Sequence, residues 1–455
     1  MRVTIAHRVT LHSPPEALAV ELQDRLTLAN PAYTDASKAG RYSGHLDETI
    51  PYWRRRGDDL VIPRGAVGLV FWLAKTHGVR VQVDDRTRLL PAVDFSFTGD
   101  LRPYQADAQA DVTRYDTGVL WAPTGSGKTV IALSAIAQRA QPALVVVHTA
   151  LLADQWVRRA ESFLGIPAAE VGRIGGGKLQ VGERLTVAII NSLAKCAADV
   201  APQVGHLVVD EAHRCVAARY AKTIGAFDAR FGLGLSATPI RRDGLSRVVG
   251  WIMGAVVKVD KTPLVASGAV LPAEVIQRQT SFTTNLDASE HYQAVLTELT
   301  ENAQRNAQIA GDVAHDLEAD GRAVALVLSD RVAHCTALQE ALAARGVQAV
   351  VLTGRLSTGA RDVALAQVDG HKVRVIIGTA QLIGEGWDFP RVSSCYMTTP
   401  IKFSGRLIQV VGRVMRPAPG KRVATIIDYV DHRVPVLAAS ARSRLGTYER
   451  EAITG

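Results

Sequence analysis

The residues with the most distinctive chemistry lie at positions 122–129, directly after the short apolar stretch Gly118 to Trp121. The two glycines of this segment leave room for backbone N–H groups to turn inward around a phosphate, and a following run with helical spacing adds the positive end of a helix dipole. Lys128 can reach the β- and γ-phosphates, and the Thr129 hydroxyl can ligate Mg²⁺. The pattern therefore predicts a site for ATP and Mg²⁺. The loop comprises Ala122, Pro123, Thr124, Gly125, Ser126, Gly127, Lys128 and Thr129.

A pair of carboxylates follows the apolar segment His206 to Val209. Asp210 would lie at the end of a buried strand, where it can hold Mg²⁺ through water, and Glu211 can orient and deprotonate an attacking water. By itself, the tetrapeptide that ends at His213 could also be an ordinary helix start with an aspartate cap. Its position after a phosphate loop and on its own apolar strand favours the catalytic interpretation.

The bulk properties predict several domains and suggest a polyanionic partner. The chain has 455 residues, of which 47% are hydrophobic and 21% charged, and its net charge is +8. We expect two to four well-packed domains, no membrane span and a cytoplasmic location, since the four cysteines are widely spaced without a metal-binding pair. The last 55 residues hold ten Lys/Arg and four Asp/Glu. Such an excess indicates contact with a polyanion or a solvated basic face.

The pattern of apolar segments divides the chain into four parts. Residues 1–90 are expected to form a small α+β module, in which Val3–Leu11 is predicted as one strand. Residues 101–262 and 263–435 each alternate strand and helix, with a single long helical run at Glu290–Leu317. Residues 436–455 are predicted to form a basic terminal helix. Two sheets with only one phosphate loop suggest a motor whose site is completed across a cleft.

Trp53 precedes three consecutive arginines in the N-terminal module. An exposed aromatic ring beside guanidinium groups could stack on and clamp a nucleic acid strand. A structural tryptophan next to an exposed loop explains the same residues equally well. The module is therefore only a possible DNA-binding element.

Over residues 101–430 the chain resembles superfamily 2 helicases of the DEAH-containing type. Arg102 and Gln105 fall in a segment similar to the adenine-reading Q motif, and residues 145–156, which include Thr149, resemble motif Ia. Residues 235–239 match motif III. The resemblance implies that His213, Ser236 and Thr238 couple hydrolysis to domain movement, that Gly384 and Asp388 in motif V and the two Q-motif residues contact ATP, and that motif VI spans Gln409 to Arg416.

The arginines of motif VI have a chemical rationale of their own. γ-Phosphoryl transfer spreads negative charge that Lys128 and Mg²⁺ only partly neutralise, and arginines from a second domain can stabilise it. Arg413 and Arg416 are three residues apart and would share one face of a helix. Surface arginines near a helix end are the alternative. Together with Gln409, they are predicted to complete the catalytic site.

The fold expected from the resemblance is two RecA-like doubly wound parallel-sheet domains in tandem behind the α+β module. Residues 238–244 resemble the extension found in XPB-type repair helicases, and residues 41–84 resemble the N-terminal module of UvsW-like phage helicases. These similarities imply a DNA substrate, 3′→5′ polarity and branched or damaged structures. Thr149, Arg331 and Thr379 are the predicted DNA contacts, and Phe403 is a candidate strand-separating wedge, although a core phenylalanine is the commoner interpretation.

The prediction is therefore an ATP-dependent DNA helicase or translocase, expected to be a monomer with unknown protein partners. A nucleotide-gated binding module or an RNA helicase, in which hydrolysis serves release, is the alternative. A small-molecule phosphotransferase would explain neither the second sheet nor the motif VI arginines.

Overall fold

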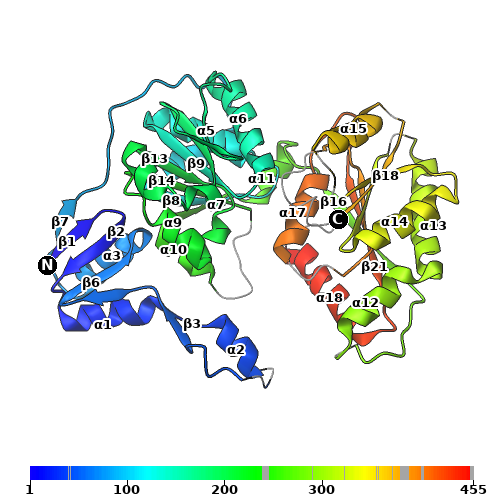
Figure 1. Cartoon of the computed structure of the whole chain (residues 1–455), viewed down its shortest axis with the longest axis horizontal. Coiled ribbons are helices and arrows are strands. Elements are labelled where there is room, and N and C mark those ends of the chain that lie inside the picture. Colours follow the sequence, from blue (N-terminus) through cyan, green and yellow to red (C-terminus); the bar gives the residue numbers. More distant parts are fainter. Residues whose placement is uncertain are drawn as a thin grey trace. The chain divides into compact units, whose positions relative to one another are not determined.

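The structure is a computed structural model that describes residues 1–38, 40, 42–237, 245–288, 290–321, 323–354, 356, 358–370, 372–379, 389–400 and 404–450. The chain divides into two compact units (Figure 1). The first comprises residues 1–123 and 127–260, and the second comprises residues 261–455 together with the tripeptide 124–126. None of the described helices is both long and apolar enough to cross a membrane.

A five-stranded sheet forms the N-terminal part of the first unit, in the order β5-β6-β2-β1-β7. One face carries Val3, Val9 and Leu11, which pack with apolar side chains of two helices into a core. The other face is polar because neighbouring residues of a strand point to opposite sides. The elements of this part are β1 (Arg2–Ile5), β2 (Arg8–His12), α1 (Glu16–Arg25), β3 (Thr27–Ala29), α2 (Pro31–Lys38), β4 (Thr49–Pro51), β5 (Arg54–Arg56), β6 (Asp59–Pro63), α3 (Val67–Thr76) and β7 (Gln82–Asp85).

This part contains one clear departure from the prediction. The segment Val3–Leu11 forms a hairpin of two antiparallel strands, in which Val3 pairs with Leu11, rather than one strand. The alternation of apolar residues continues through the turn, so the sequence pattern does not indicate where the first strand ends. Trp53 donates its indole N–H to the Thr27 hydroxyl at 2.9 Å and packs against the core. These contacts favour the interpretation of Trp53 as a structural residue over the interpretation as an exposed ring that stacks on nucleic acid.

The remainder of the first unit is an eight-stranded sheet in the order β11-β10-β12-β9-β13-β14-β8-β15, parallel except for the β10–β11 pair. Its central strands are apolar and buried, as expected for a parallel sheet covered on both faces. The strands are β8 (Thr117–Trp121), β9 (Ala143–Val147), β10 (Gly172–Gly175), β11 (Lys178–Gln180), β12 (Leu185–Ile189), β13 (His206–Val209), β14 (Phe231–Ser236) and β15 (Ala255–Lys258). The helices are α4 (Pro103–Thr113), α5 (Lys128–Arg139), α6 (Ala150–Leu164), α7 (Ile190–Leu193), α8 (Ala197–Val200), α9 (Ala218–Ile224) and α10 (Ser246–Met253).

Two arginines attach the N-terminal sheet to this larger sheet. Arg64 donates to the backbone carbonyls of Ala229 and of Arg230, the latter at 2.6 Å. Arg88 forms a two-pronged ion pair with Asp228, with both N···O distances 2.9 Å. A long irregular segment then connects β7 to α4 (Figure 1). The N-terminal part is thus bound to the start of β14 by specific hydrogen bonds.

The second unit is built on a six-stranded, all-parallel sheet in the order β16-β21-β20-β17-β19-β18. Both units therefore contain the parallel α/β sheet expected of tandem RecA-like domains. The strands are β16 (Ala273–Gln279), β17 (Ala325–Ser329), β18 (Ala349–Leu352), β19 (Val375–Thr379), β20 (Ser394–Met397) and β21 (Ala424–Val430). The helices are α11 (Lys261–Ala266), α12 (Tyr292–Glu301), α13 (Ala303–Ala319), α14 (Val332–Ala343), α15 (Thr358–Asp369), α17 (Ser404–Val414) and α18 (Pro435–Arg450).

One helical prediction for this unit needs correction, whereas the predicted terminal helix is present as α18. The run Glu290–Leu317 is two helices, because the Asn302 side chain caps α13 by accepting the Arg305 N–H at 2.8 Å. The terminal helix is less basic at its surface than its sequence suggests, since Arg444 is buried against Asp428 with N···O distances down to 2.7 Å. Part of the C-terminal positive charge is therefore paired inside the core and is not at the surface.

Buried histidines predict that acid destabilises both units. Burial, followed by the charge of Arg139, lowers the pKa of His206 to about 3, and burial, followed by the charge of Arg305, lowers that of His334 to about 3. Each histidine is neutral when folded but takes up a proton when unfolded below about pH 6.5, so stability falls as the pH drops from 6.5 toward 3. We expect a loss of about 2 kcal/mol per histidine at pH 5, measured by urea unfolding at pH 7 and pH 5.

The variant His334→Gln tests the contribution of this residue. It removes one titrating group, although it also disturbs the hydrogen bonds of His334 to Ser329 and Asn306, at 3.0 and 2.9 Å. The decisive quantity is therefore the dependence of stability on pH and not stability at pH 7. An unchanged pH dependence in the variant would contradict the assignment.

Candidate nucleotide site

The phosphate loop lies where the sequence predicts it, between β8 and α5. Gly125 and Gly127 have φ angles of +89° and +78°, which residues with a side chain rarely adopt, and Gly127 caps α5. A Cβ atom at Gly127 would collide with the Gln105 amide. The loop therefore needs glycine for both its backbone conformation and its packing, and it leaves the N–H groups at the start of α5 available for phosphate.

Lys128 points back over this loop. Its ammonium group donates to the carbonyl oxygens of Ala122 at 2.9 Å and Pro123 at 3.1 Å. Its positive charge also favours ionisation of Asp210 and Glu211, so the lysine lies near both carboxylates. Strand order explains this proximity, since β8, β14 and β13 are adjacent and their carboxyl ends share one edge.

Asp210 is held in a fixed orientation at the end of β13. The Trp156 indole N–H donates to Asp210 Oδ2 at 2.9 Å, and the Glu211 backbone N–H donates to Asp210 Oδ1 at 2.9 Å. Glu211 itself has φ +51° and ψ +49°, a left-handed conformation that is unusual for a residue with a side chain. Such conformations cluster at functional sites. Trp156 lies in the segment that was predicted to contact nucleic acid. Its hydrogen bond to Asp210 was not predicted.

The two carboxylates have opposite electrostatic environments. Burial, reinforced by the charge of Glu211, raises the pKa of Asp210 above its usual value. Burial also opposes ionisation of Glu211, but the hydrogen bond and charge of His213 outweigh it and lower the pKa of Glu211. Two adjoining, partly buried carboxylates near Lys128 form an oxygen-rich site suited to a hard cation. These residues therefore fit Mg²⁺, which Asp210 would hold and for which Thr129, at the start of α5, would be the hydroxyl ligand.

A chain of contacts links Glu211 to the end of β14. His213 Nδ1 lies 3.2 Å from Glu211 Oε2 and 3.3 Å from the Ser236 hydroxyl. The structure thus brings together two of the three residues expected to couple hydrolysis to movement. Thr238 lies outside the described residues. Because His213 contacts both partners through one nitrogen, a change at Glu211 can alter the bond to Ser236 at the end of β14.

Replacing Glu211 by glutamine tests the expected base. We expect ATP binding to persist and kcat to fall by about 10²–10⁴-fold, because an amide cannot take the proton of the attacking water. Steady-state phosphate release and nucleotide binding would be measured on the same preparation. Glu183→Gln is a control on an exposed carboxylate of the same unit. Normal turnover of the Glu211 variant would exclude it as the base.

Gln105 lies beside the loop, whereas Arg102 is exposed. Gln105 is buried, and its Oε1 accepts the Arg102 backbone N–H at 3.0 Å as part of a capping box at the start of α4. Its amide group also borders Gly127. The structure therefore gives Gln105 a role in shaping the loop, and adenine recognition by Arg102 and Gln105 stays a prediction.

Motif VI occupies the last turns of α17 in the second unit, with one correction. Gln409 and Arg413 are on the helix, but Arg416 lies two residues beyond its end at Val414. Lys421 closes this end, since its ammonium donates to the carbonyls of Arg416 at 2.9 Å, of Pro390 at 3.1 Å and of Val414. Burial, followed by the charge of Arg416, lowers the pKa of Lys421 to about 7. A lysine thus positions the backbone of Arg416.

The predicted DNA contacts all lie at or just after the end of a strand, at the carboxyl edge of their own sheet. Thr149 caps α6 by accepting the Leu152 N–H at 3.3 Å, and Thr379 ends β19. Arg331 donates to the Gln293 backbone carbonyl at 3.1 Å and to its side chain at 2.8 Å. DNA contact by Arg331 would have to replace these bonds. Gly384, Asp388 and Phe403 lie outside the described residues.

Comparison with known protein families agrees with this arrangement. The family model described as "Type III restriction enzyme, res subunit" matches residues 98–241, and the one described as "Helicase conserved C-terminal domain" matches residues 308–418. The first match contains the phosphate loop and the carboxylate pair, and the second contains motif VI. The chain belongs to the superfamily 2 helicases. Together the two matches cover more than half of this helicase.

Curated relatives agree with the finer resemblance. "Probable helicase D10" of Escherichia phage T5 is 26% identical over 69% of this chain and 68% of its own length. "Putative DNA 3'-5' helicase Rad25" of Halobacterium salinarum is 27% identical over 70% of this chain and 52% of its own. The helicase thus spans about half to two thirds of these relatives. The predicted resemblance to repair helicases of the XPB/Rad25 type is confirmed.

Solved structures support the fold. A fragment of a putative HsdR subunit of a type I restriction enzyme from Vibrio vulnificus matches 76% of this helicase and 66% of that chain, with a TM-score of 0.57 and 18% identity. UvsW of bacteriophage T4 aligns with 99% of the helicase and 98% of that chain, at a TM-score of 0.44 and 19% identity. The HsdR match supports the tandem parallel-sheet architecture.

Proposed function

We propose that this chain is an ATP-driven DNA helicase or translocase that moves along or remodels DNA with 3′→5′ polarity. The observation that carries the proposal is the contact chain from Asp210 and Glu211 through His213 to Ser236. It joins the groups suited to hydrolysis to Ser236, which ends β14 and belongs to motif III. Two relatives are named "Putative DNA 3'-5' helicase Rad25", which supports a DNA substrate and 3′→5′ polarity for this chain.

In this mechanism the phosphate loop binds the nucleotide, and the carboxylates that follow β13 hold the attacking water. The N–H groups of the loop and Lys128 bind phosphate, exchanging the carbonyl contacts of Lys128 for phosphate oxygens. Mg²⁺, when bound, neutralises charge on the phosphates. Glu211, which is readily ionised, accepts the proton of the water, and its altered charge acts on His213. Arg413 and Arg416 are proposed to stabilise the developing charge from the second unit.

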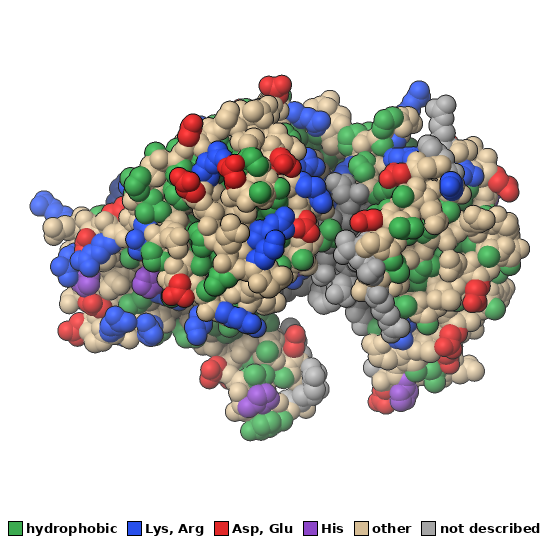
Figure 2. All heavy atoms as spheres, turned by 45° about the horizontal axis from the view of Figure 1, so that its top comes forward, with side chains coloured by type: hydrophobic (Ala, Val, Ile, Leu, Met, Phe, Trp, Pro, Cys, Tyr) green, Lys and Arg blue, Asp and Glu red, His purple; other side chains and the backbone are tan. Residues whose placement is uncertain are grey.

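DNA contacts are proposed at the carboxyl edges of both sheets and chiefly to phosphates, since a motor that moves along any sequence needs contacts indifferent to the bases. Figure 2 shows positive and negative side chains interspersed on the visible face of the first unit. DNA contact is therefore proposed at the strand ends rather than over a broad basic face. We further propose a monomer acting in a reducing compartment, which fits the four free cysteines.

The experiment is steady-state ATP hydrolysis with no nucleic acid, single-stranded DNA, forked DNA, a four-way junction or structured RNA. Stimulation by DNA, greatest with forks or junctions, is expected. Equal stimulation by RNA would contradict the DNA preference. No stimulation by any of them would contradict the motor while leaving an ATPase.

A further inference from the structure

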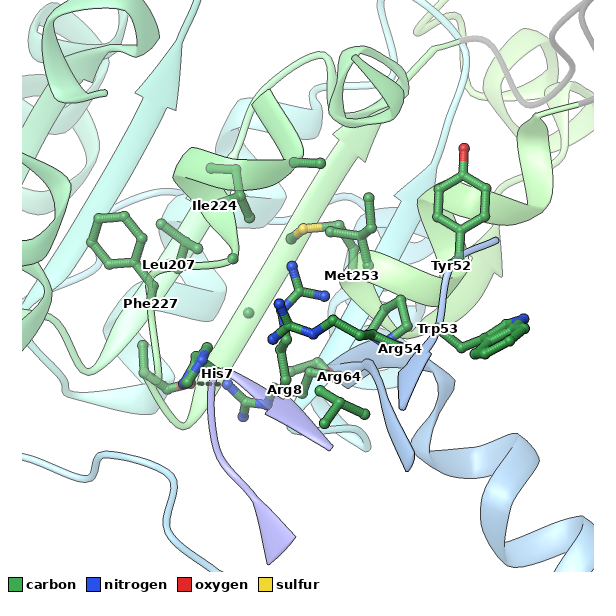
Figure 3. A pocket seen from close by; sticks show the side chains of 18 of the residues that line it. His7, Arg8, Tyr52, Trp53, Arg54, Arg64, Leu207, Ile224, Phe227 and Met253 are labelled. Carbon is green, nitrogen blue, oxygen red and sulfur yellow. Dashed lines mark hydrogen bonds between the residues drawn. The ribbon is translucent and has the colours of Figure 1, made fainter. Parts of the chain in front are cut away.

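The first unit contains a cavity of about 330 Å³ that the nucleotide site does not use (Figure 3). It lies between the polar face of the N-terminal sheet and the starts of strands in the larger sheet. Thr117, Leu207 and Phe231, from β8, β13 and β14, are among its lining residues. The other ends of the same three strands lead to the phosphate loop, Asp210 and Ser236. The cavity and the nucleotide site therefore lie at opposite edges of one sheet.

The charged groups of this cavity are all basic. Arg8 from β2, Arg54 from β5 and Arg64 direct their guanidinium groups toward it, and no aspartate or glutamate lines it (Figure 3). The Arg64 guanidinium is occupied by backbone carbonyls, whereas the guanidinium groups of Arg8 and Arg54 have no hydrogen bond or ion pair with any residue that the structure describes. Burial and the charge of Arg54 lower the pKa of Arg8. Two unneutralised cations thus adjoin each other.

The opposite wall of the cavity is apolar. It includes the side chains of Leu207, Ile224, Phe227 and Met253 (Figure 3). Paired guanidinium groups favour a planar or tetrahedral oxyanion, and an apolar wall favours a hydrocarbon or aromatic body. The size suits a small molecule. A DNA strand would instead need a basic groove that follows its backbone, and the neighbouring Arg55 is already paired with Glu16 at 2.7 Å.

We propose that this cavity is a second ligand site, which binds a small molecule with an oxyanion at the two arginines and an apolar body against the opposite wall. The oxyanion is a carboxylate, phosphate or sulfonate. A ligand there contacts both the N-terminal sheet and the larger sheet, so it stabilises their attachment by mass action. The site is separate from the proposed ATPase chemistry and does not depend on it.

The test uses the full chain and two fluorescent probes that share one aromatic body. Anilinonaphthalene sulfonate carries the oxyanion, and phenylnaphthylamine lacks it. The variants are Arg8→Gln with Arg54→Gln together, Arg54→Gln alone, and Arg56→Gln as the control. Arg56 is an exposed arginine on the same strand and does not line the cavity. Circular dichroism checks the folding of each variant, and Arg54→Gln on its exposed strand keeps the test open if the double variant fails to fold.

We expect one sulfonate probe per chain, with affinity reduced about tenfold or more in the double variant and severalfold in Arg54→Gln, and unchanged in Arg56→Gln. Phenylnaphthylamine should bind all variants alike. Equal sulfonate affinity in wild type and Arg54→Gln would overturn the proposal, as would displacement of the probe by ADP with Mg²⁺. If a short DNA oligonucleotide displaced the sulfonate probe and benzyl phosphate did not, the arginines would be assigned to DNA binding. That result would also overturn the proposal.

Discussion

Replacing Lys128 by alanine is expected to lower ATP turnover by about a thousandfold or more, because the ammonium group that points over the phosphate loop is lost. Two effects act together. The phosphates lose a cationic partner, and Asp210 loses a charge that favours its ionised form. The measurement is steady-state phosphate release at saturating ATP and DNA, with nucleotide affinity determined in parallel.

Lys75→Ala is the control for this experiment. Lys75 is an exposed lysine on α3, so its removal tests the effect of one lost charge away from the loop. The melting temperature of both variants should stay close to that of the wild type. If Lys128→Ala retained ATP turnover, this would contradict the proposed role of the phosphate loop in ATP hydrolysis, whatever the result for DNA binding.

Replacing Arg416 by alanine is expected to lower kcat by about 10³–10⁵-fold with little change in stability, the range found for arginines that stabilise transferring phosphoryl groups. The backbone of Arg416 is held by Lys421, so truncating the side chain leaves the end of α17 in place. ATP turnover, nucleotide affinity and melting temperature would be measured for Arg413→Ala, Arg416→Ala and the control Arg422→Ala. Arg422 is an exposed arginine in the same unit.

The pattern across the three variants decides the assignment. A loss confined to kcat in Arg416→Ala supports a group that acts in the transition state. A mild effect there, with a large one in Arg413→Ala, would make Arg413 the principal arginine. Mild effects in both would contradict completion of the site by motif VI.

Local chemistry explains which parts were predictable from the sequence. The phosphate loop needs glycines, a lysine and a hydroxyl within a few residues, so its composition alone identifies it. The parallel strands are apolar on both faces and equally recognisable. The prediction that Arg416 lies on a helix with Arg413 was wrong, although the sequence indicates that the helix ends before Arg416. Pro417 disfavours helical backbone at the residue before it.

Contacts between distant residues were not predictable. Trp156 and Asp210 are 54 residues apart, and neither residue type indicates the other as its partner. The hairpin at β1–β2 was missed because Ala6 and His7, between the strands, are not typical turn residues. In contrast, the break at Asn302 could have been found, since asparagine is a strong helix cap.

The bond between Trp156 and Asp210 makes the indole a natural optical probe of the candidate metal site. The indole emits from a buried position and donates its N–H to the carboxylate proposed to hold the cation. Neutralising that carboxylate changes the electric field at the indole, and this shifts the wavelength and the intensity of its fluorescence emission. Titration with Mg²⁺ or acid should therefore be visible in intrinsic fluorescence, and Trp156→Phe should silence that component while the other five tryptophans keep emitting.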